Sequence, residues 1–187
     1  HIRGRKYAFG VLRESGRNDA WEADILNLFQ GLRAQIFTVV MDKKAHLENY
    51  PLQTFDAYAY SLAVLLWRVR GYLQFSVGDV DVLAEARGKR EDAGIQRTYE
   101  LLRSRGVSEW GTPEGYSQAF PDEAIIFRKK EHNVAGLQLA DLVAFGQKVL
   151  TVAEAEKPLA RPPSDFANRM NAAIQSKVNR NGRYMLG

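Results

Sequence analysis

Cysteine is absent from this chain of 187 residues. This absence excludes disulfide bonds, thiol nucleophiles and thiolate zinc sites, and it leaves the redox compartment open. Long apolar runs are also missing, since no stretch approaches the roughly 20 residues that a helix needs to span a bilayer. With no secretory signal visible, the sequence predicts a protein of the cytoplasm that has no membrane partner.

Histidine is scarce, and the common catalytic motifs do not occur. The three histidines stand singly at His1, His46 and His132, which is more typical of surface or loop positions than of a catalytic base. The sequence contains no G-x-G-x-x-G after a strand, no Walker A motif, no H-E-x-x-H and no G-x-S-x-G. The usual dinucleotide, P-loop, zinc-protease and serine-hydrolase sites are thereby excluded.

The charge balance has a modest positive excess. The formal net charge is +4 and the sequence pI is about 9.3, with 45% hydrophobic and 26% charged residues. This balance is typical of a globular domain. The excess is compatible with a polyanionic partner, but by itself it is a weak signal.

Hydrophobic periodicity in the first half of the chain predicts alternating helices and strands. A helix is expected at 19–32, and the continuously apolar, β-branched stretch 35–41 predicts a strand that is buried on both faces. A long apolar helix follows at 52–73, and a second strand is expected at 79–85. Because strand, helix and strand follow one another, we expect the two strands to be parallel with a right-handed crossover.

The second half continues the pattern and ends in a polar tail. A helix is expected at about 90–105, a short strand at 124–129, a helix at 134–150 and a final helix near 164–178. The prediction is an α/β fold with helices on both faces of one sheet. We expect a domain at 1–152 and a polar helical extension at 153–187.

Acidic residues stand at the ends of both predicted strands. Asp42 follows the strand at 35–41, and Glu85 ends the strand at 79–85. Open parallel sheets bind ligands at the carboxyl ends of their strands. We therefore expect both carboxylates to project toward the same edge.

A third carboxylate, Asp141, lies on the predicted helix at 134–150. It stands beside a ridge of small residues, Gly136, Ala140 and Ala144, which predicts close packing of this face on the sheet. Burying a lone carboxylate costs several kcal/mol unless it is paired or coordinated. Two partners remain open at this point: Lys148 in an ion pair, or a divalent metal.

The residue types indicate which metal and which substrate would suit such a site. Carboxylates without cysteine or suitably spaced histidine favour a hard cation such as Mg²⁺ or Mn²⁺. Two such ions roughly 4 Å apart commonly support phosphodiester hydrolysis. Basic residues follow the predicted strands and suit a phosphate backbone; they are Lys43, Lys44, Arg87, Lys89, Arg90, Arg128, Lys129 and Lys130.

Several segments resemble the family catalogued as domain of unknown function 3800. The most specific is "KKEHNVAGLQLADLVAF", 129–145, whose G-L-Q-x-A-D-L-V-A pattern follows the family's C-terminal signature. "HIRGRKYAFG", "IFTVVMDKK", "NYPLQTFDAYAYSLAVLLWR" and "LAEARGKRED" match less specifically, and the resemblance covers about 1–150. It implies a ribonuclease-H-like mixed sheet and a partner that is nucleic acid.

The resemblance also implies roles for individual residues. Asp141 would be a metal ligand from the last helix, joined by Glu85 and Asp42 from the strands, and Asp92 in "KRED" completes the candidate catalytic set. The candidate substrate-binding residues are Lys43, Arg87, Lys89, Lys130 and, within the signature, Gln138.

One characteristic part of the family pattern has no counterpart in this sequence. Members begin with a strand that ends in Asp-Glu-Ser-Gly, ahead of the "HIRGRK" segment. Here "RESG" at 13–16 follows that segment, and the chain opens without methionine. We therefore expect a natural N-terminal portion, with the first strands of the sheet, to be missing.

Three functions follow as hypotheses. The first is a metal-dependent nuclease or phosphodiesterase that acts on nucleic acid. The second is a catalytically inert nucleic-acid-binding or interaction module of the same fold, in a defence or mobile-element system. The third is a structural domain in which Asp141 pairs with Lys148.

Overall fold

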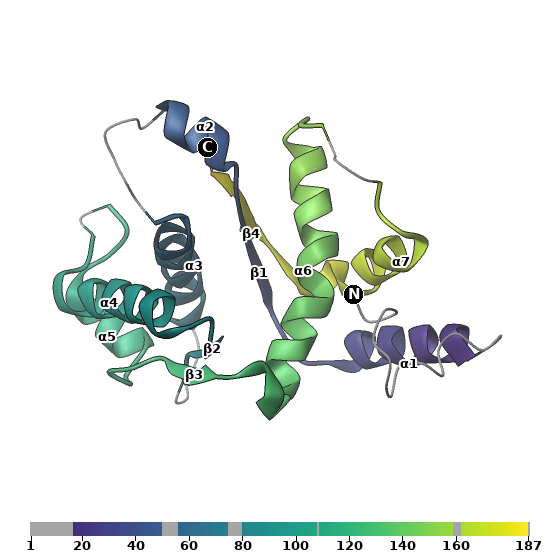
Figure 1. The fold of residues 1–187 in the computed structure, drawn as a ribbon, viewed down its shortest axis with the longest axis horizontal. Coiled ribbons are helices and arrows are strands. Elements are labelled where there is room, and N and C mark those ends of the chain that lie inside the picture. Colours follow the sequence, from purple (N-terminus) through teal and green to yellow (C-terminus); the bar gives the residue numbers. More distant parts are fainter. Residues whose placement is uncertain (1–16, 50–55, 75–79, 108, 159–161, 187) are drawn as a thin grey trace.

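The computed structural model describes residues 17–49, 56–74, 80–107, 109–158 and 162–186 (Figure 1). The fold is a mixture of α and β elements, with more helix than strand. The helices are α1 Arg17–Gly31, α2 Lys43–Asn49, α3 Ala57–Leu73, α4 Lys89–Arg105, α5 Pro113–Ala119, α6 Ala135–Glu154 and α7 Asp165–Ile174, with short 3₁₀ helices η3 Lys130–His132 and η4 Gln175–Lys177. The strands are β1 Ile36–Met41, β2 Leu83–Glu85, β3 Ile126–Arg128 and β4 Val178–Leu186.

The strands form two separate parallel pairs instead of one sheet. β1 pairs with β4, and β2 pairs with β3 through Leu83–Ile126, Ala84–Phe127 and Glu85–Arg128. The prediction that the strands at 35–41 and 79–85 belong to one sheet is wrong within the described residues. The neighbour of β1 comes from the far end of the chain, where we had expected only helix.

The predicted helices are confirmed in position. α1, α4, α6 and α7 occupy the expected stretches, and α3 covers the described part of the helix predicted at 52–73. Asp56 begins α3 by accepting hydrogen bonds from the backbone N–H groups of Tyr58 and Ala59, an N-cap that satisfies donors without a partner in the helix. The "HIRGRKYAFG" and "RESG" segments and residues 52–55 of the helix predicted at 52–73 lie outside the described residues.

One hydrophobic cluster lies between α3, α4 and α5, against the β2–β3 pair. Tyr99 and Leu102 of α4, which the sequence places on its apolar face, are buried there. Tyr116 of α5 and Phe120 complete the centre of the cluster. In Figure 1 these helices form one side of the molecule, with β2 and β3 at their lower edge.

A second cluster lies between α1, α6, α7 and β1. Its buried members are Phe29, Val143, Met170, Ile174 and Val178. Two of them, Met170 and Ile174, belong to α7, so this helix takes part in the core and does not lie apart from it. The division into units 1–152 and 153–187 stays a prediction.

Buried polar contacts hold α7 in place. Arg169 of α7 pairs with the buried carboxylate of Glu22 on α1. On the α6 side, Gln147 Nε2 donates a 3.0 Å hydrogen bond to Asn171 Oδ1. Within the described ranges, no helix combines the length and apolar character needed to cross a membrane.

Candidate functional site

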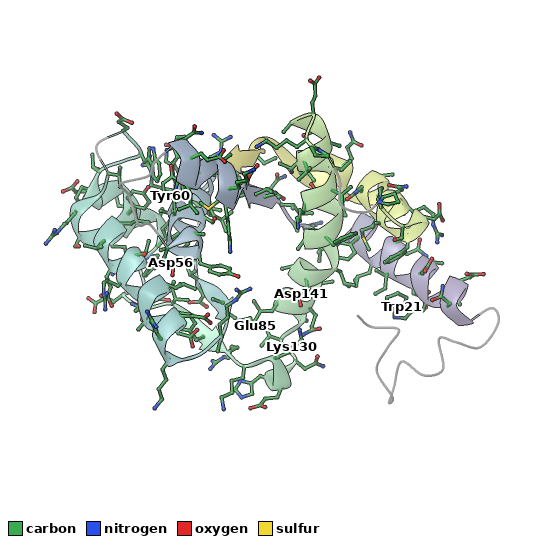
Figure 2. All side chains as sticks on the ribbon, turned by 45° about the horizontal axis from the view of Figure 1, so that its top comes forward. Trp21, Asp56, Tyr60, Glu85, Lys130 and Asp141 are labelled. Carbon is green, nitrogen blue, oxygen red and sulfur yellow. The ribbon has the colours of Figure 1, made fainter. Side chains whose placement is uncertain are left out.

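Two of the predicted acidic residues converge on one lysine. Glu85 lies at the end of β2 and Asp141 in the second turn of α6, and Figure 2 shows both beside Lys130. Lys130 Nζ is 3.5 Å from Asp141 Oδ2 and 4.0 Å from Glu85 Oε1. The ammonium of Lys130 therefore lies between the C-terminal end of β2 and the N-terminal part of α6.

The environment of Asp141 differs from the prediction. Its side chain is 62% exposed, and Gly136, Ala140 and Ala144 are exposed beside it. The face of α6 that packs inward carries Val143 and Gly146 instead. The prediction that the small-residue ridge lies against the sheet is therefore wrong, and desolvation does not force Asp141 to have a partner.

Lys130 takes the place that the ion-pair alternative had assigned to Lys148. Side chains on a helix lean toward its N-terminus, so Asp141 is directed toward η3, which immediately precedes α6. Lys148 lies two turns further on, about 10 Å along the axis. Because both groups of the Lys130–Asp141 pair are substantially exposed, the pair itself contributes only about 0–1 kcal/mol to stability.

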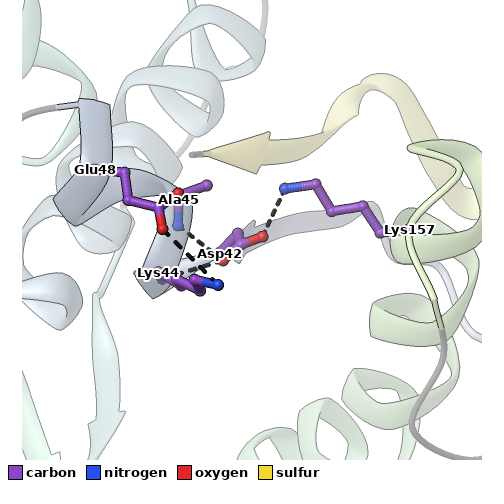
Figure 3. Close-up of polar contacts among 5 residues, drawn as sticks. All are labelled: Asp42, Lys44, Ala45, Glu48 and Lys157. Atoms are coloured by element: carbon purple, nitrogen blue, oxygen red, sulfur yellow. Dashed lines mark hydrogen bonds and ion pairs between the residues drawn. The ribbon is translucent and has the colours of Figure 1, made fainter.

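Asp42 lies in a separate environment, at the start of α2 (Figure 3). Its Oδ1 accepts hydrogen bonds from the backbone N–H groups of Lys44 and Ala45, both at 3.1 Å. Its Oδ2 accepts a 2.6 Å hydrogen bond from Lys157 Nζ. The Lys157 ammonium, followed by the N–H of Ala45, lowers the pKa of Asp42 below its ordinary value of 3.8.

The position of Lys157 separates Asp42 from Asp141. The backbone N–H of Lys157 donates to the carbonyl of Val152, near the C-terminal end of α6. Asp141 lies eleven residues before Val152, about 16 Å along the helix axis. Asp42 is therefore not brought together with Asp141 and Glu85, and a shared metal centre would require a large rearrangement.

Asp92 has a structural explanation of the same kind as Asp42. It lies in the first turn of α4, and its carboxylate accepts hydrogen bonds from the backbone N–H groups of Arg87 at 2.8 Å and Gly88 at 3.4 Å. These bonds close the loop that joins β2 to α4. Gly88 has a φ of 140°, a conformation that suits glycine in such a loop.

The basic residues after the two predicted strands do converge, on an aromatic ring that sequence reasoning missed. The ring belongs to Tyr58, in the first turn of α3, and is 47% exposed. Lys43 Nζ lies 5.2 Å and the Arg87 guanidinium 4.4 Å from its centroid. Lys43, which follows β1, and Arg87, which follows β2, thus meet over one ring, although the two strands belong to different sheets and do not share an edge.

The other predicted substrate-binding residues are placed as follows. Lys89 is exposed in the first turn of α4, and Gln138 is half-buried in the first turn of α6. Lys44 pairs with Glu48 at 3.9 Å, and Lys129 pairs with Glu131 at 3.5 Å. Neither pair lies between the carboxylates of Glu85 and Asp141.

A metal ion would find two carboxylates here, and not three. Among the described residues, no group of three or more His, Asp or Glu side chains is arranged to hold a metal. Mg²⁺ is commonly held in proteins by one or two carboxylates, while waters and substrate phosphates complete its octahedron. Comparison with known proteins adds no family assignment, because no family model, curated protein or solved structure matches this chain.

Proposed function

We propose that this protein binds nucleic acid and hydrolyses its phosphodiester bonds with Mg²⁺ or Mn²⁺ held by Glu85 and Asp141. The observation that carries the proposal is the convergence of these two carboxylates on one cationic point, Lys130 Nζ, from two different elements. Two carboxylates that face the same cation would repel each other without it. A divalent ion meets the same requirement with greater charge.

The basic residues supply the binding part of this function. Lys130, displaced from the carboxylates by a metal ion, can turn its ammonium toward a phosphate oxygen of the substrate. Lys43 and Arg87 lie on the adjoining surface and offer two further phosphate contacts. A bound divalent ion supplies charge neutralisation at the scissile phosphate and activation of water.

The resemblance of the α6 segment adds support. "GLQLADLVA", 136–144, follows the signature of a family with an expected ribonuclease-H-like fold, in which the last helix contributes a metal ligand. Asp141 occupies that position, and Glu85 faces it from a strand end. We propose the ribonuclease-H-like fold on the same grounds.

The test is cleavage of labelled single- and double-stranded DNA and RNA in Mn²⁺. Glu85→Gln and Asp141→Asn should each lower the rate by at least about 100-fold, since each removes one of the two ligands. Asp24→Asn, an exposed carboxylate on α1, is the matched control and should cleave at the parent rate. If Asp141→Asn cleaves as fast as the parent, the assignment is wrong.

Metal binding has a readout of its own. Calorimetric titration with Mn²⁺ should give a binding heat for the parent protein, and Asp141→Asn should abolish it. Asp141→Asn should therefore lose Mn²⁺ binding and cleavage of nucleic acid together. A heat that survives in both variants would place the metal elsewhere.

A nucleic-acid-binding module without catalysis is the second candidate. The observation that favours it is Lys130 itself, whose ammonium lies within ion-pair distance of both carboxylates and offsets part of their charge. The two candidates differ in one result. A parent protein that binds oligonucleotide in EDTA, but gives neither Mn²⁺ heat nor cleavage, is the inert module.

A further inference from the structure

Three side chains from three elements make a small cationic and aromatic surface, here called the tyrosine platform. Its members are Lys43 at the start of α2, Tyr58 in the first turn of α3 and Arg87 in the loop after β2. Both cations lie over the ring of Tyr58, and both are exposed to solvent. Positive charge therefore adjoins the partly exposed Tyr58, and Lys43 and Arg87 meet there although they are 44 positions apart in the sequence.

Each member of the tyrosine platform is carried by a backbone that an aspartate holds in place. Asp56 accepts the N–H of Tyr58 at 2.7 Å, and Asp92 accepts the N–H of Arg87 at 2.8 Å. Asp42 caps the turn that begins with Lys43, through the N–H groups that follow it. The carboxylates are thus engaged by backbone donors and, at Asp42, by Lys157, so they order the backbone that carries the two cations.

We propose that the tyrosine platform binds single-stranded nucleic acid, with an unpaired base stacked on Tyr58 and neighbouring phosphates on Lys43 and Arg87. Base–aromatic stacking is stronger than an exposed cation–π contact, so a base can displace either cation from the ring. The displaced cation remains beside the base, where the sugar–phosphate backbone passes. One single strand would then contact both the aromatic ring of Tyr58 and the positive charges of Lys43 and Arg87.

The platform discriminates against duplex substrates. A base inside a duplex is stacked on both sides by its neighbours, so its face is not available to Tyr58 unless it is unpaired and splayed out. Lysine and arginine side chains alone would bind the phosphates of a single strand or of a duplex. The aromatic ring between them is what selects a single strand.

The platform adjoins the carboxylate site. Glu85 and Arg87 are two residues apart, so their Cα atoms are separated by at most about 7 Å. A strand whose base lies on Tyr58 therefore passes close to Glu85 and its partner Lys130. This inference rests on the proposed function for the identity of the ligand class, and it adds the strandedness of the substrate.

Binding is measured in EDTA, so that cleavage plays no part. Fluorescence anisotropy of a labelled 12-nucleotide oligo(dT) and of a mixed-sequence duplex of the same length gives the two affinities. Tyr58→Ala should bind the single strand about 10-fold more weakly, and Tyr58→Phe, which keeps the ring, should stay within about twofold of the parent. Duplex binding should not change in either variant.

A tyrosine elsewhere on the same helix is the matched control. Tyr72 is 41% exposed and lies about 21 Å from Tyr58 along the α3 axis, so Tyr72→Ala should bind like the parent. Lys43→Gln and Arg87→Gln should each reduce the slope of log affinity against log salt by about 0.7 for the single strand. Thermal melts establish that each variant is folded, and Tyr58→Leu replaces Tyr58→Ala if the latter is not.

The outcomes separate the two proposals. Equal loss of single-strand and duplex binding in Tyr58→Ala, or no loss at all, overturns the tyrosine platform and leaves the proposed function standing. A parent protein that binds neither oligonucleotide overturns both. Normal Tyr58-dependent binding together with an uncleaved substrate in Mn²⁺ supports the platform and removes the catalytic part of the proposed function.

Discussion

At the scale of single residues, three aspartates of this protein satisfy backbone donors at the start of helices or in the loop before one. The first N–H groups of a helix have no partner within it, and a short carboxylate just before or within the first turn accepts them. Asp42 does this for α2, Asp56 for α3, and Asp92 does it for the loop before α4. The same residue type at the same strand ends also suits a metal site, so composition and position alone leave both roles open.

The ion pair of Asp42 predicts a pH dependence. Because its pKa in the folded protein lies below the ordinary 3.8, the ionised form stabilises the fold. This contribution is complete above pH 3.8 and is lost as the pH falls through the lowered pKa. Replacing Lys157 with methionine should raise the pKa of Asp42 toward 3.8, as an NMR titration of its carboxyl group would show.

Lys44 provides the control for this titration. Its side chain pairs with Glu48, and only its backbone N–H reaches Asp42. Lys44→Met should therefore leave the pKa of Asp42 close to that of the parent. Equal titration curves for the parent and Lys157→Met would contradict the contact between Lys157 and Asp42.

At the scale of elements, α6 shows how a helix chooses the face that it buries. Gly136 and Gly146 both lie on this helix, but they meet different surroundings. A Cβ at Gly136 has no atom within 4 Å, whereas a Cβ at Gly146 would lie 2.6 Å from Asn171 Oδ1. The close approach of helices occurs at Gly146, where Asn171 Nδ2 also donates to the Gly146 carbonyl at 3.2 Å.

Two glycine substitutions on α6 test this arrangement. Gly146→Ala should lower the free energy of unfolding by about 1–3 kcal/mol, because the new methyl group overlaps Asn171 and its buried hydrogen bonds. Gly136→Ala should raise it by about 0.5 kcal/mol, because alanine loses less backbone entropy in a helix. Urea denaturation measures both, and a strong loss of stability in Gly136→Ala would show that this face is packed after all.

At the scale of the whole molecule, the last strand of the described residues pairs with the first. β4 runs parallel to β1, with Thr38 opposite Arg183 and Met41 opposite Leu186. Figure 1 shows this pair in the middle of the molecule, between the α3–α4–α5 side and the α6–α7–α1 side. The tail that looked polar and helical in sequence therefore closes the centre of the fold.

A truncation tests the importance of β4. A chain that ends after Lys177 loses the strand that pairs with β1, and Val178 is removed from the second cluster. We expect this chain to lose its cooperative thermal transition in circular dichroism, because the backbone groups of β1 would lack their partners. A truncated chain that unfolds cooperatively at the same temperature as the parent protein would contradict the placement of β4.

The sequence by itself determined the local elements of this protein. The helices at α1, α3, α4, α6 and α7 and the cores of β1, β2 and β3 follow from apolar spacing, which depends on residues a few positions apart. Side chains on the apolar face of α4, Tyr99 and Leu102, were predictable for the same reason. Lys43 and Arg87 could also be predicted from sequence, because they directly follow the predicted strands.

Tertiary structure alone decided which elements meet. The partner of β1 comes from about 140 residues further along the chain, and strand pairing at that separation leaves no local pattern. The buried face of α6, the choice of Lys130 over Lys148, and the meeting of Lys43 and Arg87 at Tyr58 depend on the same long-range packing. Periodicity specifies that a helix has an apolar face, but the neighbouring elements determine which residues at its border are covered and which charges come within reach.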